Sequence, residues 1–329
     1  MDARSPLVDP KKAALLKGFI ASKHAGSICV ANYKGGVGKT TITCLLGYYL
    51  ARRTKKKVLL FDIDPQCSLS LAFGFDPEEV NKTELTIYNL VKPSKWAKIS
   101  KTNFLSYASG VKDSLAPKNL QLVKGSFAVE DLDVEIVKSL FDSSRRVDEL
   151  FLYSKQMLNA FDDYEYILVD TPPNKMYLTQ AMLRACSYFI PVTIPDEISI
   201  YGMPRLLQWV DQIPAGERPH LLGYVLNAVN RTGGGPKGKV NSQVTAESRL
   251  KTRILANLRP TEKGVLDPDP CLGAIPRLDA VARFLGERDA KFSRSALQMH
   301  TSSQPSVDEC LNALVDKLIA RMKGYNAKN

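Results

Sequence analysis

The fold of this chain is decided by one short stretch, Lys34-Gly35-Gly36-Val37-Gly38-Lys39-Thr40-Thr41. An apolar run at residues 27–33 precedes it, and a segment of helical character follows it to about residue 53. Glycines leave room for backbone N–H groups to point inward, and the start of a helix adds positive charge at the same place. The stretch is therefore predicted to bind phosphates, with Lys39 beside the β- and γ-phosphates of a nucleotide and the Thr40 hydroxyl on Mg²⁺.

Further apolar runs predict the sheet that carries this loop. The run 58–61 ends at Asp62-Ile63-Asp64, so strand, glycine loop, helix and strand follow one another as a βαβ unit. Other buried-strand patterns end at Asp170 or lie at residues 120–123, 188–194 and 222–229, and residues 131–160 are predicted to be helical. Continuous apolar runs that alternate with helices indicate an α/β fold, a mostly parallel twisted sheet with helices on both faces.

Composition excludes several classes of protein. The 329 residues contain no apolar run long enough to span a membrane, and the first residues lack the pattern of a signal peptide. The six cysteines include no C-x-x-C pair, and the three histidines lie far apart, so we expect reduced thiols in the cytoplasm and no metal cluster. The net charge of +11 suggests a polyanionic partner, either nucleic acid or an anionic membrane.

Three boxes resemble those of one family. Tyr33 occupies the first glycine position of the general P-loop pattern and a second lysine, Lys34, follows it, so the loop resembles the deviant Walker A box of the ParA/MinD ATPases. Asp62-Ile63-Asp64-Pro65-Gln66 resembles the D-x-D-P-Q switch of that family, and Ile167-Leu168-Val169-Asp170-Thr171-Pro172-Pro173 resembles its Walker B strand. The resemblance extends over about residues 27–322, with residues 1–26 and parts of residues 80–160 outside it. It implies a single deviant Walker ATPase domain at residues 27–329, preceded by a basic extension at residues 1–26.

The resemblance also implies the site residues. In this family two protomers enclose two ATP molecules, and the extra lysine, here Lys34, reaches the partner's phosphates. Asp64 would orient the attacking water and couple to Mg²⁺, and Asp170 would hold Mg²⁺ through water. Asn227 would contact the adenine, with Asn230 as the competing candidate. The predicted catalytic residues are Lys34, Lys39 and Asp64, the metal site is Thr40, Asp64 and Asp170, and the nucleotide site is Lys34, Gly35, Gly36, Val37, Gly38, Lys39, Thr40, Thr41 and Asn227.

Basic residues concentrate late in the chain. Residues 231–259 contain seven Lys or Arg against Glu247 alone, a net charge of +6. Several lie on a helix predicted at residues 242–258, where Arg249 and Arg253 share a face. ParA-type proteins bind DNA without sequence preference through basic residues of this half, and the other interpretation is a solvated helix face. The candidate DNA contacts are Arg231, Lys237, Lys239, Arg249, Lys251 and Arg253.

The resemblance to ParA implies a DNA partition ATPase. ATP would drive formation of a homodimer that binds nonspecific DNA at the nucleoid, and a ParB-like centromere-binding or cargo adaptor would stimulate a weak ATPase and so move plasmid, chromosome or other cargo. The alternatives are a MinD-like membrane-associated positioning ATPase and a ParA-like positioner of a protein cargo. The last helix, predicted at residues 306–323, mixes acidic and basic residues on its polar face, which favours packing on the sheet over membrane binding.

Overall fold

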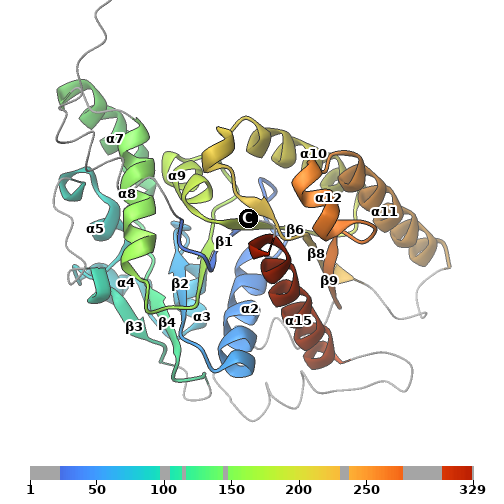
Figure 1. Ribbon diagram of the computed structural model, residues 1–329. Helices are drawn as coiled ribbons and strands as arrows, with labels where there is room; N and C mark the ends of the chain where they lie inside the picture. Colours follow the sequence, from blue (N-terminus) through green and yellow to red (C-terminus); the bar gives the residue numbers. More distant parts are fainter. Residues whose placement is uncertain are drawn as a thin grey trace, which may run out of the picture.

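The computed structural model describes residues 23–96, 104–112, 116–143, 147–229, 237–276 and 306–327. Its strands form one twisted sheet in the order β3-β4-β2-β5-β1-β6-β8-β9, and β7 extends it beside β6 (Figure 1). All pairs of neighbours are parallel except β3 and β4, which are antiparallel at one edge. The strands are β1 (Ser27–Ala31), β2 (Val58–Asp62), β3 (Ala108–Gly110), β4 (Leu120–Val123), β5 (Tyr166–Asp170), β6 (Tyr188–Thr193), β7 (His220–Leu221), β8 (Tyr224–Val229) and β9 (Cys271–Pro276).

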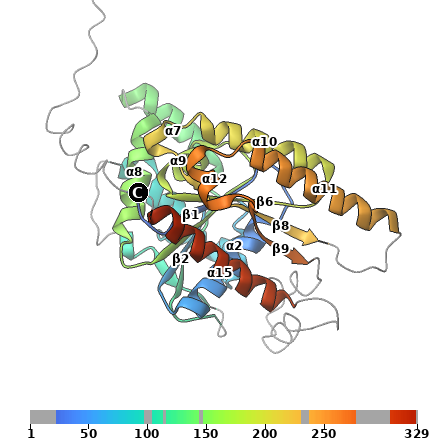
Figure 2. The ribbon, with the colours of Figure 1, turned by 45° about the vertical axis from the view of Figure 1, so that its right-hand side comes forward.

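Helices cover the sheet from both sides, as Figure 2 shows. Every residue of β1, β2 and β5 is buried, which explains why these strands are continuous apolar runs in the sequence. Two hydrophobic cores result, one on each face. The helices are α2 (Lys39–Thr54), α3 (Ser68–Ala72), α4 (Pro77–Asn81), α5 (Ile87–Val91), α7 (Val129–Ser143), α8 (Val147–Ala160), α9 (Tyr177–Ala185), α10 (Glu197–Asp211), α11 (Lys237–Ala256), α12 (Pro260–Leu266) and α15 (Val307–Asn326), with 3-10 turns η1 (Pro93–Lys95) and η2 (Ala215–Glu217).

The two cores divide the helices between them. Side chains of α2, α3, α4 and α15 pack on one face of the sheet, and side chains of α5, α7, α8, α9, α10, α11 and α12 pack on the other. The α/β fold with a mostly parallel sheet is thus confirmed. The strand order places the ends of β1, β2 and β5 side by side, and these ends carry the P-loop, Asp62 and Asp170.

Some predicted boundaries need correction. The helical region predicted at 131–160 contains two described helices, α7 and α8. The strand predicted at 222–229 begins at Tyr224, since Gly223 adopts a left-handed φ of +106° that interrupts the extended backbone after β7. Helix α11 begins at Lys237, five residues before the predicted start. Residues 1–22 of the basic extension, together with Asn230 and Arg231, lie outside the described residues.

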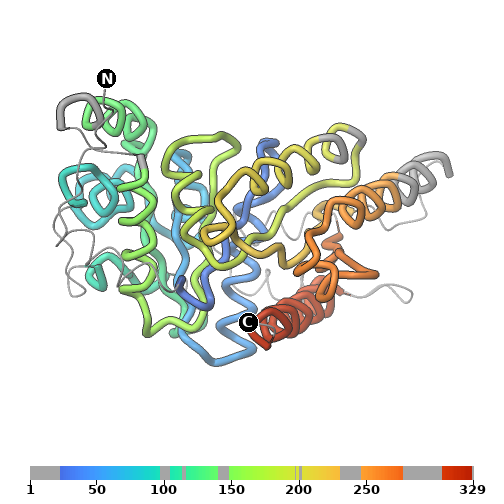
Figure 3. Tube along the Cα trace, turned by 45° about the horizontal axis from the view of Figure 1, so that its top comes forward, coloured from blue at the N-terminus to red at the C-terminus, as the bar shows by residue number. Residues whose placement is uncertain are grey.

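The last helix, α15, packs on the sheet beside α2, as predicted (Figure 3). Ser306 caps its first turn by accepting a hydrogen bond from Glu309 N, at 3.1 Å. Its apolar stripe is fully buried, as shown by Val307, Leu311, Leu314, Val315 and Leu318. None of the described helices has the length and apolar content that crossing a membrane requires.

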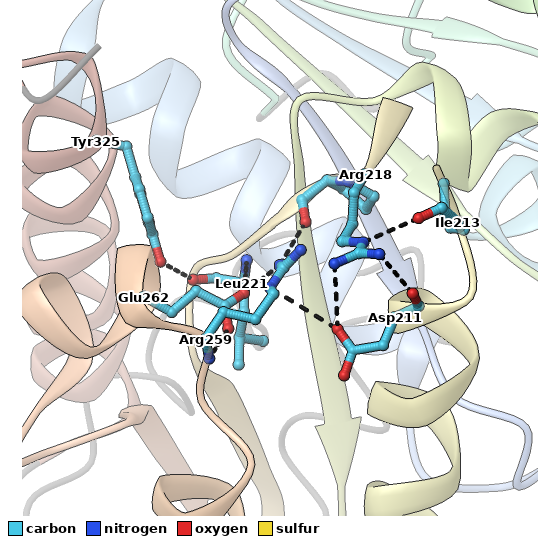
Figure 4. Close-up of polar contacts among 8 residues, drawn as sticks. Asp211, Ile213, Arg218, Leu221, Arg259, Glu262 and Tyr325 are labelled. Carbon is cyan, nitrogen blue, oxygen red and sulfur yellow. Dashed lines mark hydrogen bonds and ion pairs between the residues drawn. The ribbon is translucent and has the colours of Figure 1, made fainter. Parts of the chain in front are cut away.

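A polar cluster joins α15 to the other late elements (Figure 4). Tyr325 donates a hydrogen bond to the carbonyl of Leu221 in β7, at 2.8 Å. The Leu221 N–H in turn donates to the carboxylate of Glu262 in α12, at 3.1 Å, and Glu262 is paired with Arg259. Arg259 also lies 3.9 Å from Asp211 at the end of α10. These contacts satisfy a buried carboxylate and fix α10, α12 and α15 relative to the sheet.

Candidate functional site

The P-loop turns tightly between β1 and α2. Gly36 and Gly38 have φ values of +71° and +91°, a conformation that favours glycine. A Cβ atom on Gly38 would lie 2.0 Å from the side-chain nitrogen of Asn227, so a larger residue there would collide with β8. The sequence predicts that these glycines keep the loop free of side chains at the start of a helix, and the backbone geometry agrees with that prediction.

Lys39 begins α2 and is buried. Its ammonium points back over the loop and donates a hydrogen bond to the carbonyl of Lys34, at 3.3 Å. Burial lowers the pKa of Lys39, while the carboxylates of Asp170 and Asp64 act to raise it. The lysine is therefore held close to the loop that would cradle phosphates, with acidic groups nearby.

Two buried carboxylates lie side by side next to this lysine. Asp62 and Asp170 are paired in register at the ends of β2 and β5, and both are fully buried. Asp62 Oδ2 accepts hydrogen bonds from Ser70 N, at 2.7 Å, and Ser70 Oγ, at 2.6 Å. Asp62 Oδ1 and Asp170 Oδ2 have no hydrogen-bond partner among the described residues. Burial raises the pKa of Asp62 to about 7, and burial together with the neighbouring Asp62 raises the pKa of Asp170 well above its usual value.

The unpartnered carboxylate oxygens fit a divalent cation. The Thr43 hydroxyl donates a hydrogen bond to Asp170 Oδ1, at 3.3 Å, and the side chain of Thr40 acts to lower the pKa of Asp170. Hydroxyls and a carboxylate therefore meet near the start of α2. The described residues include no group of three or more His, Cys, Asp or Glu side chains arranged to hold a metal. Mg²⁺ needs no such group, because it is commonly held by one or two carboxylates and by substrate phosphates, with water completing its shell.

Asp64 lies at the mouth of the site. Its side chain is partly exposed, and its Oδ1 accepts a hydrogen bond from Gln66 N, at 2.9 Å, which shapes the turn after β2. Its charge acts on Lys39. The structure therefore brings all three predicted metal ligands, Thr40, Asp64 and Asp170, to the same end of the sheet.

Lys34 points away from Lys39. Its ammonium forms an ion pair with Asp196 Oδ2, at 2.6 Å, and a hydrogen bond with Ser199 Oγ, at 3.0 Å. Burial alone would raise the pKa of Asp196, but hydrogen bonds from Lys34 and Ser199 lower it overall. Asp196 is also the N-cap of α10, where it accepts from Ser199 N at 2.6 Å. Sequence analysis missed both partners of Lys34, although the pattern Asp196-x-x-Ser199 after a strand is a recognisable helix start.

Tyr33, the residue at the first glycine position, packs outside the phosphate cradle. Its ring lies 5.4 Å from that of Trp209 in α10, and Lys175, which follows the Walker B box, lies 4.8 Å from the Tyr33 ring. An aromatic residue at this position therefore connects the P-loop to α10. Nothing in the sequence pattern signals these contacts, because Tyr33, Lys175 and Trp209 are far apart along the chain.

Asn227, the predicted adenine contact, lies against the P-loop. Its side-chain nitrogen donates a hydrogen bond to the carbonyl of Val37, at 2.9 Å. This bond uses one side of the amide to hold the loop and leaves its oxygen as an acceptor. Recognition of adenine by Asn227 stays a prediction.

Helix α11 carries the described part of the basic patch. Its buried stripe of Ala246, Leu250 and Ile254 packs against the core, while Arg249 is exposed and Lys251 and Arg253 are partly exposed. Figure 1 shows α11 at the edge opposite β3 and β4. Lys237 and Lys239 belong to the first turns of α11, of which only the backbone is described.

The geometry of the site agrees with comparisons to known proteins. A family model described as an AAA domain matches residues 25–222. The chain is 27% identical over 263 residues to a virulence plasmid ParA family protein, pGP5-D, of Chlamydia psittaci, and the match covers 73% of this chain and 90% of the relative.

Solved structures share the fold. Apo McdA of Cyanothece aligns with a TM-score of 0.66 and 16% identity, over 89% of this chain and 99% of that protein. The septum site-determining protein MinD of Pyrococcus horikoshii, in complex with Mg-ADP, aligns with a TM-score of 0.55 and 17% identity, over 89% and 95% of the two chains. The family match spans the P-loop, the switch segment and the Walker B strand together. The chain therefore belongs to the AAA-domain family and, within it, to the ParA/MinD type of P-loop ATPase.

Proposed function

We propose that the protein is an ATP-driven DNA partition switch, formed by a single ATPase domain at residues 27–329. ATP-bound chains pair as a sandwich dimer that binds DNA without sequence preference, and hydrolysis releases the dimer from DNA. A ParB-like adaptor stimulates the weak intrinsic hydrolysis, and the cycle moves a plasmid, chromosome or other cargo over the nucleoid.

The observation that carries this proposal is that the side chains of the two P-loop lysines, Lys34 and Lys39, point in different directions. Lys39 is buried over its own loop, whereas the side chain of Lys34 is 30% exposed and points toward α10. The Lys34 ammonium does not lie at the phosphate site of its own chain. In the dimer it contacts the phosphates that the second chain binds. Such a group acts as an arginine finger does, by stabilising charge that develops on the transferred phosphate.

The positions of the other site residues support the remaining roles in this proposal. Asp64, at the mouth, orients the attacking water, and Thr40, Asp64 and Asp170 hold Mg²⁺, with Asp170 acting through water. Bound Mg²⁺ would neutralise charge on the phosphates. The two high-pKa carboxylates, Asp62 and Asp170, would favour their charged forms when a cation binds beside them.

The basic residues of α11 support DNA as the partner. Arg249, Lys251 and Arg253 are at least partly exposed on a helix whose apolar stripe is already buried. Two copies of a modest patch in a dimer bind one duplex more tightly than a monomer does, because the second contact is intramolecular. The MinD-like alternative has less support, because α15 packs its apolar stripe against the sheet. A helix that binds a membrane places that stripe in the lipid instead.

The test is an anisotropy titration of random-sequence duplex with purified protein in ATP, in ADP and without nucleotide, at two salt concentrations. Binding in ATP alone that weakens steeply at the higher salt supports the proposal, since contacts to phosphates release counterions. DNA binding that is equal with ATP, with ADP and without nucleotide contradicts the proposal, as does no binding at all. Liposomes of anionic lipid are then the next partner to test.

A further inference from the structure

Two lysines lie against Phe75, a residue three positions after the end of α3. The ammonium of Lys112 is 5.1 Å from the centre of the Phe75 ring, and that of Lys124 is 5.6 Å from it. Lys124 directly follows β4, and Lys112 follows β3. Both therefore come from the β3–β4 edge of the sheet, remote from the basic helix α11 (Figure 1).

Lys124 is a lysine whose side chain is largely buried. It is 8% exposed, whereas Lys112 is exposed. Within the described parts of the chain, neither ammonium forms an ion pair with a carboxylate. Burial lowers the pKa of Lys124, and the positive charge of Lys112 lowers it further. Two neighbouring cations repel each other, and an anion that contacts both would relieve this repulsion.

We propose that Lys112 and Lys124 form a binding site for a small oxyanion of the phosphate type. Each ammonium offers three N–H donors, and their combined charge matches the charge of nearly −2 that a phosphate monoester carries near neutral pH. Because Lys124 is almost fully covered, the ligand must be small, so the backbone of a DNA duplex does not fit. Free phosphate and the terminal phosphate of a small metabolite share this chemistry.

The site lies close to the switch segment but is separate from the P-loop. Phe75 N donates a hydrogen bond to the carbonyl of Ser70, at 3.0 Å, and Ser70 holds Asp62 through its N–H and hydroxyl. Gly125, the residue after Lys124, donates its N–H to the same Ser70 hydroxyl, at 2.8 Å. An anion bound by Lys112 and Lys124 would therefore restrain Phe75 and Gly125, the two residues whose N–H groups donate to Ser70.

The test measures thermal unfolding of the full chain during titration with inorganic phosphate, at constant ionic strength set with sodium chloride. A saturating non-hydrolysable ATP analogue with Mg²⁺ is present throughout, so that all three phosphate positions of the P-loop are filled and it cannot take the added phosphate. The variants are Lys124→Met and Lys112→Met, and the matched control is Lys118→Met, an exposed lysine that precedes β4. Glucose 6-phosphate and a short DNA duplex replace phosphate in parallel titrations, to distinguish the sources of the ligand.

Phosphate should raise the Tm of the wild type and of Lys118→Met. Either lysine variant should weaken phosphate binding about tenfold or more, because a hydrogen bond to a charged group is lost. Without phosphate, Lys124→Met should melt above the wild type, since the repulsion between two neighbouring cations is gone. The same phosphate response in the wild type and both variants overturns the proposal, as does a response to duplex alone. Lys112→Met alters only an exposed side chain, so it keeps the test decisive if Lys124→Met folds poorly.

Discussion

Lys34 and Asp196 form an ion pair of 2.6 Å within one chain, between the P-loop and the N-cap residue of α10. The proposed function requires Lys34 to reach the phosphates of a second chain. The same ammonium cannot do both, so the ion pair must open before the dimer can close. The pair therefore opposes dimerisation by the free energy needed to break it.

Asp196→Asn should strengthen the ATP-dependent dimer. Asparagine caps a helix as well as aspartate does, so α10 keeps its start, but the charge that holds Lys34 is lost. The pair is about one-third exposed, which limits its contribution to about 1 kcal/mol or less. With two such pairs opened per dimer, the dimer dissociation constant should fall by up to about thirtyfold. Sedimentation velocity with a non-hydrolysable ATP analogue measures it.

The control for this variant is Asp211→Asn at the other end of α10. Asp211 lies 3.8 Å from Arg218 and 3.9 Å from Arg259, so the change removes equal charge from the same helix without touching Lys34. Its dimer constant should match that of the wild type. A dimer that is unchanged or weaker in Asp196→Asn would mean that Asp196 does not restrain Lys34.

Lys34→Ala should bind ATP but fail to dimerise. Lys39 and the loop N–H groups remain to hold the nucleotide, because Lys34 contributes only its backbone carbonyl to Lys39. Loss of the cation that serves the second site should reduce hydrolysis by about 10³-fold. Calorimetric titration with ATP and sedimentation in its presence separate the two effects. Dimers that persist in the variant would contradict the role proposed for this lysine.

Arg249→Glu combined with Arg253→Glu should weaken DNA binding and spare nucleotide binding. Both side chains reach the surface of α11, away from the P-loop, and each reversal replaces attraction to a phosphate with repulsion. The slope of binding against salt should also fall, because fewer counterions are released. Anisotropy at several salt concentrations measures both quantities.

The matched control is Lys118→Glu combined with Lys138→Glu, two exposed lysines that change the net charge by the same amount. DNA binding should fall only slightly in this control, through the net charge of the protein. If the two double variants bind duplex equally, or the α11 variant binds as tightly as the wild type, the DNA surface lies elsewhere.

Sequence predicted the parts of the site that depend on local pattern. The P-loop, the end of β2 at Asp62 and the end of β5 at Asp170 could each be read from an apolar run followed by a polar turn. The P-loop, Asp62 and Asp170 lie together because parallel strands place their carboxyl ends at the same edge of the sheet. Contacts between distant segments left no such pattern, as with Lys34 and Asp196 or with Lys112 and Lys124 around Phe75.

The boundaries that were wrong have local physical causes. The strand predicted from residue 222 was read from apolar residues alone, but Leu222 and Gly223, the latter with a positive φ, separate β7 from β8. Helix α11 begins at Lys237, before the predicted residue 242, and Gly238 in its first turn weakens the helical pattern there. Apolar content predicts burial well, but where an element begins depends on backbone geometry that glycine leaves open.

Lys23→Met should change how stability depends on pH. Lys23 donates hydrogen bonds to the carbonyls of Cys186, at 2.8 Å, and Glu217, at 2.6 Å, and burial lowers its pKa from 10.5 to about 8. Between these two values the unfolded chain holds the proton and the folded chain has released it. The wild-type free energy of unfolding should therefore rise with pH from about 8 to 10.5, by at most about 1.4 kcal/mol per pH unit from this group.

Because methionine does not titrate, the advantage of the wild type over Lys23→Met should grow across this range, and urea unfolding at pH 7, 8, 9 and 10 measures it. Lys57→Met is the control, since Lys57 is exposed and lies 3.9 Å from Asp163. Its difference from the wild type should stay constant with pH. A constant difference for Lys23→Met as well would show that Lys23 keeps its usual pKa in the folded chain.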